Sequence, residues 1–173
     1  MYTRRALFSA ITFLVVFLLQ EALFTQVHLP LGGFSLLLIF SLCWASFSTP
    51  EIGAVTGFGA GFLLDLAPSS SGPVGQWTLV LIIVGFGIAY LRYGDDSLRD
   101  NPLSVVLIVA VGVVVTLTFY LLLGALLGVD FGNMAALIRT VLGNGLWTLV
   151  VTPFVLPVAS RIHSSIFETR ERA

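Results

Sequence analysis

The stretch from Phe34 to Leu66, FSLLLIFSLCWASFSTPEIGAVTGFGAGFLLDL, decides how many times this chain crosses a membrane. It is almost wholly apolar, yet it is long for one membrane span and short for two, because one span needs about 20 apolar residues. Thr49-Pro50-Glu51 interrupts it with a helix-start signal: Thr49 can cap, Pro50 suits the first helical position, and Glu51 faces the positive end of the helix dipole. The sequence therefore predicts two helices joined by a tight hairpin, at residues 34–48 and 50–66.

The composition on either side of this hairpin is that of a membrane protein. Of the 173 residues, 57% are hydrophobic and 10% are charged, and the mean hydropathy is +1.03, which lies outside the range of soluble domains. The fold class that we predict is an all-α integral membrane protein, a single transmembrane domain over residues 1–173 with six membrane-spanning helices. The other four helices are expected at residues 6–24, 74–91, 103–129 and 137–162.

The arginines orient these six helices. All eight cationic residues are arginine, and arginines near helix ends stay preferentially on the cytoplasmic side. Six helices with both termini in the cytoplasm leave only Arg139 outside, whereas five helices would place the arginine-containing C-terminal tail outside. The residues then expected inside are Arg4, Arg5, Arg92, Arg99, Arg161, Arg170 and Arg172. The outer loops, 25–33, 67–73 and 130–136, are too short to form domains, and we interpret the inner loop from Arg92 to Pro102 mainly as a solvated turn.

The sequence offers little that could support catalysis. No serine, cysteine or histidine constellation resembles a hydrolase, and no glycine-rich phosphate loop is present. His28 and His163 have no second metal ligand at a useful spacing, and Cys43 is the only cysteine. No basic patch suggests nucleic acid. We therefore expect no enzyme activity, no catalytic residues, no cofactor, no metal and no nucleic-acid partner.

The third helix contains the most informative pattern. Gly53, Gly57 and Gly61 recur every four residues and form one slowly drifting stripe, along which another helix can approach closely. Asp65 extends this stripe and Leu66 follows it. These five residues are the candidates for helix packing or partner binding. Packing inside the bundle explains most of the stripe, and for Asp65 two roles stay open: a hydrogen-bonded anchor for the turn at residues 67–75, or a contact to a partner.

A second group of polar residues is expected at the outer ends of the helices, where together with Asp65 they would line an outward-facing depression. Arg139 is the only outer cation, so we expect it to pair with Glu21, Asp65 or Asp130. The candidates for this outer polar surface are Gln20, Glu21, Gln76, Arg139 and Asn144.

The run Gly57-Phe58-Gly59-Ala60-Gly61-Phe62-Leu63-Leu64-Asp65-Leu66, followed by Gly72-Pro73-Val74-Gly75, resembles the G-F-x-x-G-L-L-L-D-L…P-L-G signature of the rod shape-determining protein MreD family. The resemblance extends to the Leu-Leu-Gln that ends the first helix, the Thr-Pro-Glu hairpin, the six-helix layout and the asparagine in the last span. Phe62 replaces the usual leucine, and the Gly-Pro-Val-Gly turn only approximates the family's Pro-Leu-Gly.

This resemblance implies a non-enzymatic scaffold of the bacterial cell-elongation complex in the inner (cytoplasmic) membrane. Its partner would be MreC, a bitopic coiled-coil protein, and through it the MreB filaments and the glycosyltransferase and transpeptidase that build lateral wall peptidoglycan. The resemblance also implies a bundle similar to the substrate-binding subunits of energy-coupling-factor transporters. The alternative is such a vitamin-transporter subunit itself, which has a similar size and an outward pocket. A homodimer also stays open.

Overall fold

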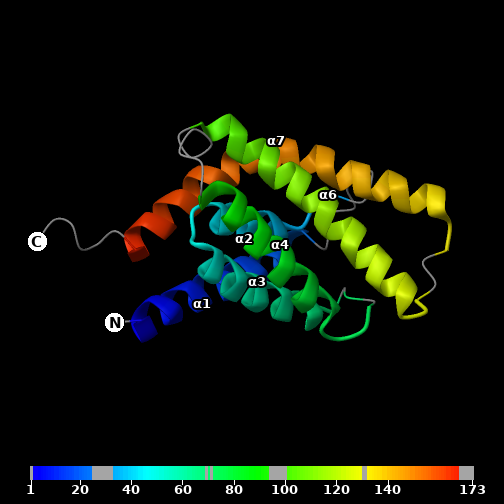
Figure 1. Cartoon of the computed structure of the whole chain (residues 1–173), viewed down its shortest axis with the longest axis horizontal. Coiled ribbons are helices and arrows are strands. Elements are labelled where there is room, and N and C mark those ends of the chain that lie inside the picture. The colour runs from blue at the N-terminus through cyan, green and yellow to red at the C-terminus, as the bar shows by residue number, and fades with distance from the viewer. Residues whose placement is uncertain are drawn as a thin grey trace, which may run out of the picture.

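The computed structural model describes residues 2–24, 33–68, 70, 72–93, 101–129 and 132–167. These residues form helices and short connections, with no strand among them (Figure 1). Four helical stretches are long and apolar enough to cross a membrane: Arg5–Ala22, Gln76–Tyr93, Pro102–Leu126 and Met134–Phe167. The chain is therefore an all-helical, multi-pass membrane protein, as its composition predicts.

The helices follow one another with short connections. Their bounds are Tyr2–Leu19 for α1, which continues as the π-helical segment η1 at Gln20–Phe24, then Leu36–Ser46 for α2, Pro50–Asp65 for α3, Gln76–Tyr93 for α4, Pro102–Leu126 for α6 and Met134–Phe167 for α7. The start of α1 and the end of α7 lie at the same end of the molecule (Figure 1), where Arg5 Nη2 donates a hydrogen bond to the Phe167 carbonyl at 3.2 Å. Pro153 and Pro157 lie inside α7, and the orange-to-red part of this helix runs at an angle to the rest.

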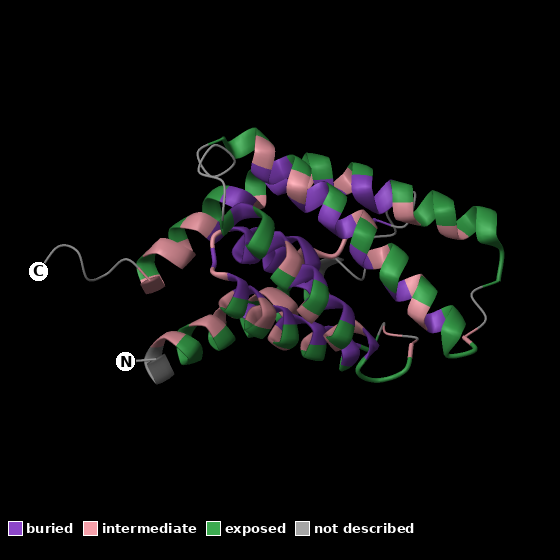
Figure 2. Ribbon diagram, viewed as in Figure 1, coloured by how far each residue is buried: buried purple, intermediate pink, exposed green. Residues whose placement is uncertain are grey.

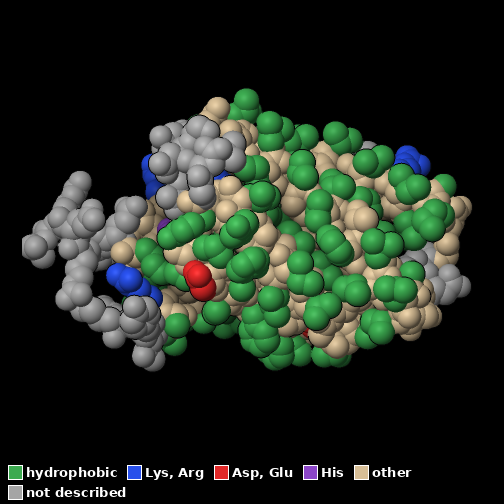
Figure 3. Space-filling view, viewed as in Figure 1, with side chains coloured by type: hydrophobic (Ala, Val, Ile, Leu, Met, Phe, Trp, Pro, Cys, Tyr) green, Lys and Arg blue, Asp and Glu red, His purple; other side chains and the backbone are tan. Residues whose placement is uncertain are grey.

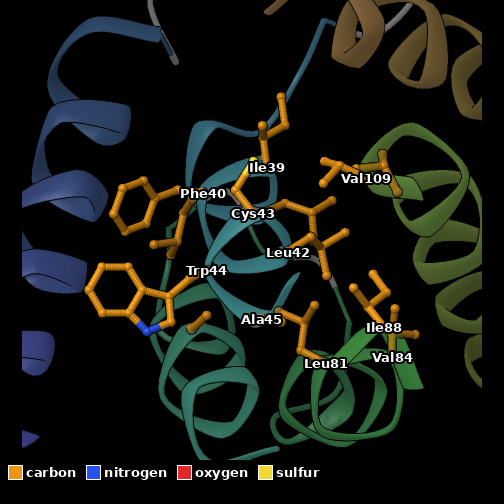
Figure 4. Packing of buried hydrophobic residues seen from close by; sticks show 14 of the residues in the cluster. Ile39, Phe40, Leu42, Cys43, Trp44, Ala45, Leu81, Val84, Ile88 and Val109 are labelled. Atoms are coloured by element: carbon orange, nitrogen blue, oxygen red, sulfur yellow. The ribbon is translucent and has the colours of Figure 1, made fainter. Parts of the chain in front are cut away.

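Helix α2 forms the centre of the bundle. Its 11 residues make it about 16 Å long, well short of the roughly 30 Å hydrocarbon core. It packs against α1, α3, α4, α6 and α7, and a helix that is apolar on all sides is expected to be buried. In Figure 4, Phe40 and Trp44 point toward α1, whereas Leu42 faces Ile88 and Val109 on the opposite side.

Local sequence signals set the ends of several helices. Ser35 caps α2 through its hydroxyl, which accepts from the Leu38 amide at 3.3 Å. Asn101 caps α6 in the same way, accepting from the Leu103 amide at 3.0 Å. Gly128, at φ +81°, directly follows Leu127, the C-cap residue of α6, where glycine is common. Thr49 occupies the N-cap of α3 as predicted, but its hydroxyl makes no capping bond.

The surface between the two ends of the molecule is apolar. Buried residues occupy the middle of the bundle and exposed ones its outside (Figure 2). Large hydrophobic side chains are nevertheless exposed along every membrane-length helix, and they are spread over the whole face drawn in Figure 3, where charged side chains are few. A soluble protein rarely exposes so continuous an apolar surface, so this exterior is suited to lipid.

Candidate functional site

The three glycines of the α3 stripe face α4. A Cβ atom added to Gly53 would lie 2.7 Å from the Gly85 carbonyl oxygen, and one added to Gly57 would overlap the Leu81 carbonyl. One added to Gly61 would lie 2.5 to 2.7 Å from the backbone at the start of α4. Only glycine allows this approach of the two backbones, so the stripe is used for packing inside the chain.

The Asp65 carboxylate binds the first turn of α4. Its Oδ1 accepts from the Trp77 amide at 3.0 Å, and its Oδ2 accepts from the Thr78 amide at 3.0 Å and from the Thr78 hydroxyl at 2.6 Å. The side chain is only 8% exposed. These bonds satisfy backbone donors that a helix start leaves open, and they place a negative charge at the positive end of the α4 dipole.

This geometry makes Asp65 an anchor that joins the end of α3 to the start of α4. It differs in detail from the predicted anchor, because the donors lie in α4 itself and not in the turn before it. A direct contact between Asp65 and a partner protein stays a prediction. Leu66, the next residue, is 58% exposed.

Gln76 and Trp77 connect this anchor to α6. The Gln76 side-chain amide donates to the Tyr120 carbonyl at 2.5 Å, and the Trp77 ring stacks on the Tyr120 ring with centroids 4.1 Å apart. Gly72 lies against the Tyr120 hydroxyl, which a Cβ atom at this position would overlap. The end of α3, the start of α4 and the Tyr120 region of α6 are thus held together by buried polar groups and one aromatic stack.

The opposite side of α3 carries no such bonds and faces outward. We define the α3 outer face as Val55, Phe58, Gly59, Phe62 and Leu66. Phe58 and Phe62 stack with centroids 6.2 Å apart and an interplanar angle of 9°. A Cβ atom added to Gly59 would meet nothing within 4 Å, so this position faces open space.

Gln20 caps a different helix. Its Oε1 accepts from the Ser35 hydroxyl and from the Leu37 amide, both at 2.9 Å, and the side chain is buried. Gln20 lies in η1, and π-helical turns are often found at functional positions. Here it satisfies donors at the start of α2.

The other residues predicted for the outer polar surface lie on η1 and α7, and the depression that they would line stays a prediction. Asn144 is buried on α7 and donates to the Thr140 carbonyl of its own helix at 3.0 Å. Glu21 is half-buried, and Arg139 is exposed on α7. The Asp65 oxygens are bonded to the start of α4, and a pairing of Arg139 with Glu21 stays a prediction. The third candidate, Asp130, lies outside the described residues.

Arg92 corrects the interpretation of the inner loop. It was expected in a solvated turn, but it belongs to the last turn of α4 and is 1% exposed. Its Nη1 donates to the Ser46 carbonyl at 3.0 Å, and its Cζ lies 5.9 Å from the centre of the Phe47 ring. The guanidinium therefore binds the carbonyl end of α2, a favourable place for a cation.

Cys43 and His163 are residues of types that often bind metals, and both contact other parts of the bundle. Cys43 is a buried free thiol, and His163 Nε2 lies 3.2 Å from the Ser48 hydroxyl while its ring stacks on Phe167. No group of three or more potential metal ligands occurs in the described part of the chain. His28 lies outside that part.

No model of a protein family, no curated protein and no solved structure matches this chain at a significant level.

Proposed function

We propose that this chain is a member of the rod shape-determining MreD family and acts as a non-enzymatic scaffold of the cell-elongation complex in the bacterial inner membrane. In this proposal six helices cross the membrane in a bundle like that of energy-coupling-factor substrate-binding subunits, and both termini are cytoplasmic. The observation that carries the proposal is the signature run from Gly57 to Leu66 together with the Gly72-Pro73-Val74-Gly75 turn.

The contacts that the signature residues make in the structure support this proposal. Gly57 and Gly61 allow α3 to touch the α4 backbone, Asp65 bonds the first turn of α4, and Gly72 allows the turn to pass beside Tyr120. The signature thus encodes one rigid hairpin. A scaffold needs a rigid surface, because a partner then binds without ordering it first.

The α3 outer face is the surface that this hairpin presents. Phe58 and Phe62 supply a flat aromatic area, and Gly59 allows a second helix to come close. Small residues beside large apolar ones are typical of helix–helix contacts in membranes. We infer that the single membrane helix of an MreC-like bitopic protein docks here. The glycine stripe and Asp65 then hold this face in place through their contacts with α4.

The remaining partners follow from this contact. An MreC-like protein reaches the wall synthases with its coiled coil, so this chain would influence the glycosyltransferase and transpeptidase, and the MreB filaments, through it. Regulation of lateral peptidoglycan synthesis and of cell shape is the expected consequence.

Paired alanine variants test the proposed contact. Phe58→Ala/Phe62→Ala removes the aromatic pair of α3, and Phe86→Ala/Tyr90→Ala removes a similar exposed stacked pair from α4, with centroids 6.0 Å apart. We expect the tagged α3 variant to lose the MreC-like protein in pull-downs from native membranes, by roughly tenfold or more, since interface aromatic residues commonly contribute about 2 kcal/mol or more. The α4 variant should retain it.

The pull-down also separates the transporter alternative. Mass spectrometry of the same sample would detect a bound vitamin together with ATPase subunits if the chain were a substrate-binding subunit. That result, or equal retention of the MreC-like protein by both paired variants, would contradict the scaffold proposal at the α3 outer face.

A further inference from the structure

A groove between α1 and α7 opens on the side of the bundle. It holds about 560 Å³ of space. Its walls are formed by Ile11 and Val15 of α1 and by Val155 and Val158 of α7, and α2 contributes Phe40. Both wall helices are long and apolar enough to cross a membrane, so the groove faces the hydrocarbon region.

The groove has an almost wholly apolar lining. Thr12 is the one polar side chain in it, and its hydroxyl donates to the Phe8 carbonyl of the same helix at 2.9 Å. Such a lining offers no hydrogen bond to an occupant. It suits a chain of methylene groups.

Each wall helix has an arginine beyond one end of the groove, although neither arginine lines it. On α1, the Arg5 guanidinium lies at the last residue of α7, donating to the Phe167 carbonyl at 3.2 Å with its Cζ 5.5 Å from the Phe167 ring centre. On α7, Arg161 is exposed and directly precedes Ile162, which lines the groove. Arginine is the side chain best suited to binding phosphate oxygens.

We propose that this groove is a binding site for an anionic phospholipid. One acyl chain lies between α1 and α7, and the phosphate lies at the end flanked by Arg5 and Arg161. Basic pockets between membrane helices are known to bind anionic headgroups on the cytoplasmic side, which is the side where the arginine distribution places this end. The site is independent of the partner contact proposed on α3.

A second groove, between α4 and α6, provides the comparison. It holds about 430 Å³, and its lining, which includes Ile83, Gly87, Leu107 and Val111, contains no charged residue. Arg92, at the nearby end of α4, is buried and bonded to Ser46. The two grooves therefore share their apolar character and differ in the arginines beyond one end.

Native mass spectrometry of the purified full-length chain tests the site. The probes are phosphatidylglycerol and phosphatidylcholine with identical acyl chains, added in equal amounts. We expect phosphatidylglycerol to be retained roughly tenfold better, since two arginines would lie near its anionic headgroup. Arg161→Gln and Arg5→Gln/Arg161→Gln should reduce this preference stepwise, and Arg5→Lys/Arg161→Lys should restore most of it.

Matched variants test the position of the acyl chain. Val158→Trp fills the α1–α7 groove and Val111→Trp fills the α4–α6 groove, at positions that are 52% and 61% exposed. We expect Val158→Trp to lower the amount of bound phosphatidylglycerol and Val111→Trp to leave it unchanged. The proposal is overturned by equal retention of the two lipids, by a preference that survives Arg161→Gln undiminished, or by a copurifying polypeptide that occupies the α1–α7 groove in place of lipid.

Discussion

At the scale of single residues, Gly57 and Gly59 show how closely related positions take different roles. Gly57 faces the Leu81 carbonyl of α4, whereas Gly59 faces open space on the other side of α3. The spacing of four distinguishes them in the sequence, because only Gly57 continues the stripe. Asp65 was likewise expected to face protein, but its donors could not be predicted, since they depend on how α4 docks.

Gly57→Ala is expected to weaken the α3–α4 contact. The added methyl group would overlap the Leu81 carbonyl, and overpacking of this kind costs about 1–3 kcal/mol. Gly59→Ala is the matched control and should be neutral or stabilising by up to about 1 kcal/mol, because alanine favours a helix. The measurement is denaturation of the protein in micelles, followed by tryptophan fluorescence. Equal midpoints for the two variants would contradict the packing that we describe.

At the scale of elements, α2 depends on side chains that come from other helices. Gln20 binds the amide end of α2 and Arg92 binds its carbonyl end. The sequence pattern correctly indicated an apolar helix in this region, but it predicted residues 34–48, longer than the observed Leu36–Ser46. The pattern could not give the true length, because a run of apolar residues does not say where side chains distant in sequence will cap it.

Removing either cap should loosen α2. Gln20→Leu leaves the Leu37 amide without its acceptor, and Arg92→Met removes the donor to the Ser46 carbonyl; a buried polar group that loses its partner costs about 1–3 kcal/mol. Hydrogen–deuterium exchange should therefore speed up at the affected end of α2. Thr118→Val is the control, since the Thr118 hydroxyl is exposed and bonds only within α6. Unchanged exchange in both cap variants would show that α2 does not need these groups.

At the scale of the whole molecule, the all-helical membrane character follows directly from composition, and four long helices bear it out. The packing of the short helices α2 and α3 was the part of the fold that the sequence predicted least well. It depends on the glycine stripe and on side chains that cap buried helix ends. The start of α1 and the end of α7 meet through Arg5 and Phe167. The predicted six crossings would place both termini on the same side of the membrane.

Reporter fusions test that arrangement. We expect green fluorescent protein fused after Ala173 to fluoresce, because the C-terminus should be cytoplasmic, and alkaline phosphatase inserted in the outer turn at residues 67–73 to be active. The same phosphatase inserted in the inner loop at residues 94–100 is the control and should be inactive. An active phosphatase at the C-terminus would mean an odd number of crossings and would refute the six-helix topology.

The central claim is that the α3–α4 hairpin presents the α3 outer face to a membrane partner. The most direct test places a photo-crosslinking amino acid at position 62 on α3 or at position 90 on α4 and irradiates cells that make the full-length protein. We expect position 62 to crosslink to a bitopic coiled-coil protein of the MreC type and position 90 not to do so. Crosslinks to that protein from position 90 alone, or to an ATPase complex from either position, would contradict the claim.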